Sequence, residues 1–159
     1  MQLKNIILTS LLIFVTGHSE AMSSIGVENG RLRQCPSTPN CVSSQATDTR
    51  HFVEPIHIHA TLPEAKNYIL KALDKLKVSN RVIVVEDNYI RVEFFSRIFR
   101  FIDDVEFYFP NASSNELLIH VRSASRAGYY DFGVNRRRIE MIRREVEKIS
   151  NYYQTYRGE

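Results

Sequence analysis

The residues best suited to binding a negatively charged group lie between positions 122 and 144 of this 159-residue chain. This stretch, RSASRAGYYDFGVNRRRIEMIRR, contains seven arginines but only two acids, Asp131 and Glu140. Planar guanidinium groups bind carboxylate, phosphate or sulfate through paired hydrogen bonds. The order of residues is typical of a strand end, a glycine-containing turn and an amphipathic helix, for which Asn135 is the expected N-cap.

Three of these arginines, residues 136–138, fall in the first turn of the expected helix. The partial positive charge of a helix N-terminus disfavours a cation there by roughly 0.3–1 kcal/mol. We therefore expect negatively charged partners for these arginines. Such a partner can be a bound ligand. The alternative is an internal ion-pair network, because buried polar groups are usually satisfied within the fold; its acids would be Asp103, Asp104, Glu106 and Asp131.

Asp103 and Asp104 are the residues whose chemistry would suit acid–base catalysis. Adjacent strand residues point to opposite faces of a sheet, so these two carboxylates do not form a dyad. Asp103 shares its face with apolar residues, where it needs a partner or a raised pKa. One alternative is a hydrolase that uses Asp103 as its base. The other is that Asp103 binds Ser123 or backbone donors while Asp104 pairs with Arg122.

Cys35 and Cys41 are the two cysteines of the chain, and in an exported protein they are expected to form a disulfide. A single cysteine pair is poor support for structural zinc, which normally needs four ligands, and the histidines add no recognisable ligand spacing. Cys41 as a nucleophile would need a base and an oxyanion hole, and the sequence places no histidine for that role. We predict no metal, no cofactor and no catalytic residue.

The N-terminal segment predicts export. Lys4 precedes an apolar run at residues 6–15, and small residues suited to cleavage follow. We predict a signal peptide at residues 1–21 and a periplasmic or secreted protein. The alternative is a retained N-terminal anchor, which would then be the only membrane attachment; the run is short for a membrane span. A formal net charge of +3 is too mild for a nucleic-acid binder.

Residues 22–50, rich in Ser, Thr, Asn, Pro and Gly, predict an extended arm, and residues 51–157 predict a single domain. Thr61 and Glu64 have the spacing of a capping box. The apolar periodicity predicts a strand at 53–59 and a helix from the capping box to about residue 77. Four strands are predicted next, at 82–86, 89–95, 101–109 and 117–125, and a final helix follows them. This order, β-α-β-β-β-β-α, predicts an α+β fold in which two helices pack on one face of an antiparallel sheet of about five strands.

The register of the last two strands follows from their apolar residues. If Phe107 lies opposite Ile119, the buried residues of both strands share one face, whereas a slip by one residue would bring charged side chains among them. That register places Asp104 opposite Arg122 and Glu106 opposite His120.

Three blocks of this sequence resemble the signature blocks of the domain of unknown function 1499 (DUF1499) family, in the same order and spacing. They are CPSTPNCVSSQ at 35–45, FIDDVEF at 101–107, and RSASRAGYYDFGVNRRRIEMIR at 122–143. Proteins of that family are small stand-alone or membrane-tethered domains of bacteria and plastids, with no settled activity. The resemblance implies that the arm and the arginine-rich stretch form one unit. The candidate ligand-binding residues are Asn40, Ser43, Ser44, Asp103, Asp104, Arg122, Ser123, Ser125, Arg126, Asn135, Arg136 and Arg138.

These observations together predict a non-catalytic, exported domain that binds a small anionic or polar ligand, or an acidic group of a partner protein in the cell envelope. Segment 35–45 would close the site over the arginine-rich turn. The alternatives are the hydrolase based on Asp103 and a purely structural envelope factor, in which the arginines lock the arm to the sheet.

Overall fold

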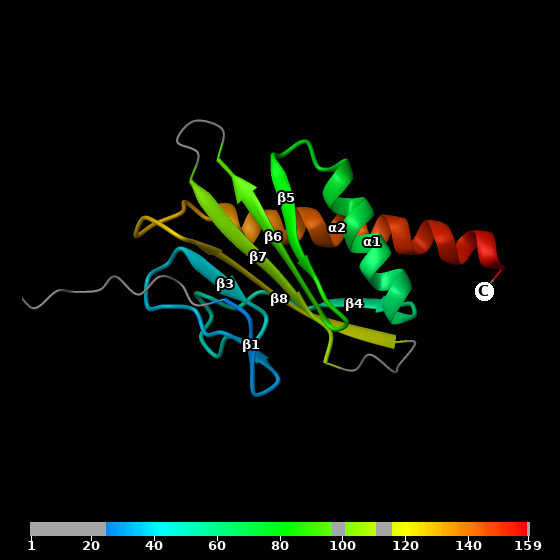
Figure 1. Ribbon diagram of the computed structural model, residues 1–159, viewed down its shortest axis with the longest axis horizontal. Coiled ribbons are helices and arrows are strands. Elements are labelled where there is room, and N and C mark those ends of the chain that lie inside the picture. Colours follow the sequence, from blue (N-terminus) through cyan, green and yellow to red (C-terminus); the bar gives the residue numbers. More distant parts are fainter. Residues whose placement is uncertain (1–24, 97–100, 111–115, 159) are drawn as a thin grey trace, which may run out of the picture.

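The computed structural model describes residues 25–96, 101–110 and 116–158, so the predicted signal peptide lies outside the described residues. The fold is α+β, as predicted (Figure 1). Its elements are β1 (Val27–Glu28), β2 (Arg31–Leu32), β3 (Cys41–Ser43), β4 (Ile56–His59), α1 (Leu62–Lys75), β5 (Asn80–Val85), β6 (Tyr89–Phe95), β7 (Ile102–Tyr108), β8 (Glu116–Ser125) and α2 (Val134–Arg157).

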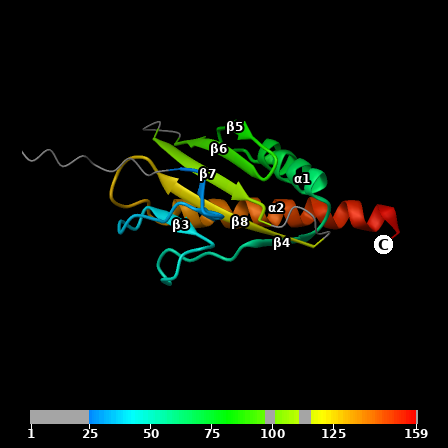
Figure 2. The ribbon, with the colours of Figure 1, turned by 60° about the horizontal axis from the view of Figure 1, so that its bottom comes forward.

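The main sheet has six strands in the order β3-β8-β7-β6-β5, and β4 pairs with the other half of β8. Both β3 and β4 run antiparallel to β8 and lie on its side away from β7 (Figure 2). The predicted arm therefore contributes a strand, β3, that the sequence pattern did not show. Three residues are too few to reveal an alternation of apolar and polar positions.

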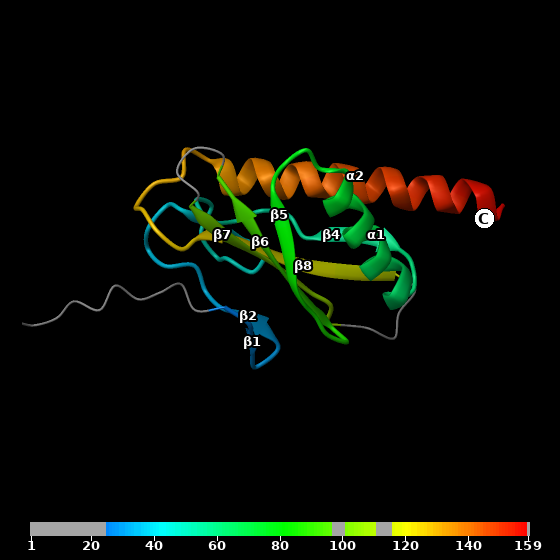
Figure 3. The same ribbon diagram turned by 45° about the horizontal axis from the view of Figure 1, so that its top comes forward.

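Both helices cover one face of the sheet, and the β1–β2 hairpin lies against the other (Figure 3). The helix-facing side chains of the strands and the apolar stripes of α1 and α2 form one hydrophobic core. α1 begins as predicted, because the backbone N–H of Thr61 donates to the carboxylate of Glu64 at 2.9 Å. It ends at Lys75, two residues before the expected end.

The register of β7 and β8 differs from the prediction by two residues. Glu106 lies opposite Arg122 rather than His120, and Asp104 lies opposite Ala124. A shift of two residues leaves every side chain on its predicted face, so the apolar alternation cannot distinguish the two registers. The consequence is chemical, because Arg122 now faces the carboxylate of Glu106 instead of that of Asp104.

The start of α2 also differs from the prediction. Asn135 is not the N-cap but a fully buried residue of the first turn, and the N-cap is Gly133, with φ of +73°. The left-handed conformation at this position favours glycine. Asp131 takes over the capping role, since its carboxylate accepts the N–H groups of Gly133 and Asn135, both at 2.9 Å.

The predicted disulfide between Cys35 and Cys41 is present, with Cα atoms 5.6 Å apart. It closes a short loop that leads into β3. Upstream of this loop, Leu32 packs between Tyr89 and Tyr108 in a second, smaller apolar cluster on the face of the sheet away from the helices. The arm is therefore docked on the domain.

We expect the double variant Cys35→Ser, Cys41→Ser to have a free energy of unfolding about 2 kcal/mol lower than that of the oxidised wild type. The reason is that even a short closed loop restricts the unfolded chain. Urea denaturation measures the difference, and reducing the wild type should reproduce it. Equal stability of all three forms would show that pairing with β8 alone holds β3.

Candidate functional site

The twelve predicted ligand-binding residues divide between the two faces of the sheet. Asp103, Ser123 and Ser125 lie on the helix-facing side, where Asn40, Asn135 and Arg138 join them. Asp104, Arg122, Arg126, Ser43 and Ser44 lie on or beside the opposite side. Arg136 belongs to neither group. The arrangement therefore brings the predicted residues into two separate clusters rather than one site.

The cluster on the helix-facing side is centred on Arg138. Its guanidinium donates to the carboxylate of Asp103 at 2.5 Å, to Asn135 Oδ1 at 2.6 Å and to Ser123 Oγ at 3.1 Å. It also lies 4.9 Å from the ring centre of Phe94. Asp103 is thus bound by an arginine of α2 rather than by Ser123 or backbone donors. A buried carboxylate held by a guanidinium is poorly placed to take a proton from water, so the geometry does not favour the Asp103 hydrolase.

Asn135 joins this cluster to the arm. Its side-chain amide donates to the backbone oxygen of Asn40 and to Ser125 Oγ, both at 3.0 Å. The side chain of Asn40 in turn donates to the backbone oxygen of Gly128 at 2.5 Å. Segment 35–45 therefore lies against the arginine-rich turn, as expected, but these contacts are made by asparagines and backbone groups rather than by the arginines.

On the opposite face, Arg122 and Glu106 form an ion pair that is completely buried, with 2.7 Å between guanidinium nitrogen and carboxylate oxygen. The second carboxylate oxygen of Glu106 accepts the hydroxyl of Tyr89 at 2.7 Å and the backbone N–H of Gly26 at 2.6 Å. Burial, together with the negative charge of Glu106, raises the pKa of Tyr89. One carboxylate therefore links β6, β7, β8 and the arm.

Arg126 forms the second ion-pair group of this face. It donates twice to Asp104, at 2.7 and 2.8 Å, and also to Glu93. The hydrogen bonds with Asp104 raise the pKa of Arg126. Glu93 is also bound by Arg81 at 2.8 Å, and these arginine contacts lower the pKa of Glu93. The acids expected to form an internal network do so, except Asp131, which caps α2.

Two further arginines of α2 bind neutral groups. Arg136 donates to the backbone oxygens of Phe52 and Arg50, at 2.6 and 2.8 Å, and so holds the segment before β4. Arg143, one residue of the same stretch, donates to the backbone oxygens of Glu54 and Pro55. Carbonyl oxygens do not neutralise the charge of Arg136, whereas Arg143 also forms an ion pair with Glu140 at 3.1 Å.

Ser44 contacts a histidine of β8. Its Oγ accepts the N–H of Val121 at 2.9 Å and lies 3.1 Å from His120 Nδ1. Because Oγ already accepts one hydrogen bond, we assign its hydroxyl hydrogen to a neutral His120. Burial, and then the nearby charges of Arg31 and His57, lower the pKa of His120, which agrees with this neutral form.

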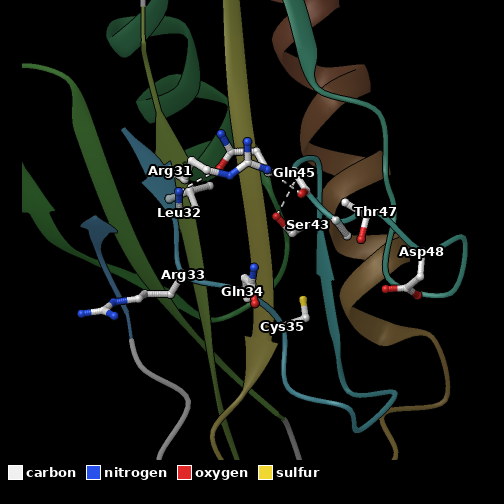
Figure 4. A pocket seen from close by; sticks show the side chains of 10 residues that line it. Arg31, Leu32, Arg33, Gln34, Cys35, Ser43, Gln45, Thr47 and Asp48 are labelled. Carbon is white, nitrogen blue, oxygen red and sulfur yellow. Dashed lines mark hydrogen bonds between the residues drawn. The ribbon is translucent and has the colours of Figure 1, made fainter. Parts of the chain in front are cut away.

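A polar cavity of about 140 Å³ lies within the arm, between residues 31–35 and the segment from β3 to residue 48 (Figure 4). Of the twelve predicted residues, Ser43 is the one that lines it. The guanidinium of Arg31 donates to the backbone oxygen of Gln45 at 3.0 Å, and the side-chain oxygen of Gln45 accepts the N–H of Leu32 at 2.8 Å. Sequence reasoning missed Arg31 and Gln45. The available signal was that polar stretches flank the disulfide on both sides.

Across the ranges that the structure describes, no group of three or more histidine, cysteine, aspartate or glutamate side chains could hold a metal ion. In the same ranges, neither helix combines the length and the apolar character needed to span a bilayer.

We expect Arg122→Ala to lower the free energy of unfolding by about 3–5 kcal/mol, because it leaves the buried carboxylate of Glu106 without its cation. The double variant Arg122→Met, Glu106→Gln should be more stable than Arg122→Ala, since no charge stays buried and the amide oxygen can still accept from Tyr89. Arg144→Ala, an exposed change on α2, is the control and should cost less than about 0.5 kcal/mol. Equal losses for Arg122→Ala and Arg144→Ala in urea denaturation would contradict this account.

We also expect acid to destabilise the protein through His120. Its pKa in the folded state lies below the ordinary value of 6.5, so the unfolded chain binds the proton more tightly. Stability should therefore fall as the pH drops from 6.5 towards the folded-state pKa, and no loss from this residue is expected above 6.5. Urea denaturation at a series of pH values tests this. His120→Gln should flatten the dependence, and an unchanged slope would refute the assignment.

One family model matches this chain over residues 31–146, and its description is "Protein of unknown function (DUF1499)". No curated protein and no solved structure matches the chain. The matched range runs from β2 into α2 and includes both ion-pair clusters and the disulfide. It also contains the three sequence blocks in which the resemblance was found. This protein therefore belongs to the DUF1499 family.

Proposed function

We propose that this protein is a non-catalytic, exported domain that binds a small anionic ligand in the cavity within the arm. The observation that carries the proposal is the position of Arg31 at this cavity. In the described part of the chain, its guanidinium donates to the neutral backbone oxygen of Gln45. The positive charge of Arg31 is therefore not neutralised by that contact.

The other charged side chains around the cavity each bind a side chain outside it. Arg33 pairs with Glu28, and Asp48 pairs with His51 at 2.9 Å. The hydrogen bond with His51 lowers the pKa of Asp48, so this carboxyl stays ionised and engaged. Arg31 is thus the cation of this cavity that is best placed to meet a ligand.

The arginine-rich turn supports anion binding less well than the cavity. Arg138 is bound to Asp103, and Arg126 is bound to Asp104, each at 2.8 Å or less. An anion at either place would have to displace a buried carboxylate, which would then lose its cation. The ligand is therefore assigned to the arm rather than to the start of α2.

The size and lining of the cavity indicate the class of ligand. A volume of about 140 Å³ suits a few heavy atoms and is small beside pockets for drug-sized molecules, which hold roughly 300–1,000 Å³. Ser43 and Thr47 supply hydroxyl groups, and Gln34 supplies an amide (Figure 4). This set fits phosphate, sulfate or a short carboxylate.

Two observations support export. The disulfide between Cys35 and Cys41 is typical of oxidising compartments. The sequence of residues 1–21 has the layout of a signal peptide. The structural role remains the second candidate, because the buried ion pairs tie the arm to the sheet whether or not a ligand binds.

Thermal unfolding with phosphate, sulfate, acetate and succinate, each compared with chloride at equal ionic strength, tests the proposal. At least one anion should raise the melting temperature, because a ligand at a hundred times its Kd stabilises the native state by about 2.7 kcal/mol. Arg31→Ala should abolish the rise, whereas Arg144→Ala should keep it.

If no anion stabilises the wild type beyond chloride, or if Arg31→Ala responds like the wild type, the binding proposal fails. The structural role would then be the candidate function that remains, and it still predicts that Arg122→Ala lowers the free energy of unfolding.

A further inference from the structure

The loop between β8 and α2 carries exposed aromatic side chains at one end of the molecule (Figure 1). Tyr129, Tyr130 and Phe132, here called the aromatic tip, are 70%, 58% and 77% exposed. The rings of Tyr130 and Phe132 pack edge to face, with centres 5.0 Å apart. Large apolar groups gathered in one exposed place often mark an interaction surface.

The backbone holds the aromatic tip in position. Phe132 has φ of +54°, in a region that bulky residues rarely adopt and that is often found at functional sites. Hydrogen bonds brace the turn on both sides of it: the N–H of Val134 donates to the backbone oxygen of Asp131 at 3.0 Å, and Arg137 donates to that of Phe132 at 2.8 Å. The exposed position of Phe132 is therefore built into the turn.

The charge around the aromatic tip is positive. Asp131 is the one acid of the loop, and its carboxylate accepts hydrogen bonds from backbone N–H groups at the start of α2. Arg136 and Arg137 donate to backbone oxygens, which are neutral, and Arg50 is exposed beside Arg136. Within the residues that the structure describes, none of these three arginines forms an ion pair.

We propose that the aromatic tip docks on a membrane surface that contains anionic lipids. Aromatic rings settle at the level of the lipid headgroups. Arginines beside them are attracted to an anionic leaflet by about 1 kcal/mol each. The loop lies at the end of the molecule opposite the C-terminus (Figures 1 and 2), where it is open to approach by a membrane surface.

The C-terminal end of α2 provides a matched control. Tyr156 there is 75% exposed, close to the value of Phe132, and its ring centre lies 4.5 Å from that of Tyr152. Lys75 and Lys148 of this region lie within 3.6 Å of the carboxylate of Glu145, whereas Lys71 donates to the hydroxyl of Tyr153. An exposed aromatic group is thus present at both ends of α2, but carboxylate partners are found for two lysines near Tyr156 and for none of the three arginines near the tip, within the residues that the structure describes.

The chain has no tryptophan, so Phe132→Trp places a single fluorophore at the tip. Adding vesicles of phosphatidylcholine and phosphatidylglycerol should shift its emission to the blue, while vesicles of phosphatidylcholine alone should not. High salt should reverse the shift. Tyr156→Trp, at the other end of α2, should show no shift with either kind of vesicle.

Co-sedimentation with the same vesicles tests the residues separately. Tyr130→Ser with Phe132→Ser should lose the binding that depends on phosphatidylglycerol, and Arg137→Ala should weaken it about fivefold. Tyr156→Ser and Arg144→Ala should bind like the wild type. Every variant keeps residues 1–24, so a contribution of that segment is the same in all of them. Urea denaturation of each variant checks that the fold is intact.

Three outcomes would overturn the proposal. The first is an emission that does not change with anionic vesicles, and the second is an equal shift for Tyr156→Trp. The third is a blue shift for Phe132→Trp that grows with protein concentration in the absence of lipid. That result would mean that the tip is buried against a second copy of the chain instead.

Discussion

The buried ion pair between Glu106 and Arg122 is the interaction on which the rest of the structure depends. An ionised carboxylate without access to water is tolerated only when it has a cation and further hydrogen-bond donors. Glu106 finds its cation on β8, a hydroxyl donor on β6 and an N–H donor at the start of the arm. Satisfying this one group therefore sets the relative positions of three strands and of the arm.

Among the described residues, the arginines differ in whether their guanidinium group binds an acid or a backbone oxygen. Arg122 of β8, Arg126 directly after this strand and Arg138 of α2 form ion pairs with buried acids, so their charge stabilises the fold. Arg136 and Arg143 bind backbone oxygens and so hold the segment before β4, and Arg143 also forms an ion pair with Glu140. Arg31 at the cavity and Arg137 beside the aromatic tip also donate to backbone oxygens and form no ion pair within the residues that the structure describes. The two proposals assign their charge to partners outside the chain.

The arm turns a sheet covered on one face into a partly three-layered domain. Its β1–β2 hairpin lies on the face away from the helices, and Leu32 fills a small apolar cluster there. Its middle segment adds β3 to the sheet next to the disulfide. The cavity exists because these two parts of the arm fold against each other. The family description names no activity, so these contacts are the basis of the functional proposal.

Local patterns in the sequence were sufficient for the two helices, the capping box at Thr61, the disulfide, and the face of the sheet on which each residue of β7 and β8 lies. Each of these depends on residues close together in the chain or on a strict period of apolar positions. The register of β7 and β8, by contrast, determines which acid forms an ion pair with Arg122. Apolar and polar side chains alternate along a strand with a period of two residues, so this pattern cannot detect a register shift of two residues. The partner of Arg138, the capping role of Asp131 and the cavity beside Arg31 likewise required tertiary structure. They arise where segments distant in sequence come within a few ångströms of one another, and no local period records that distance.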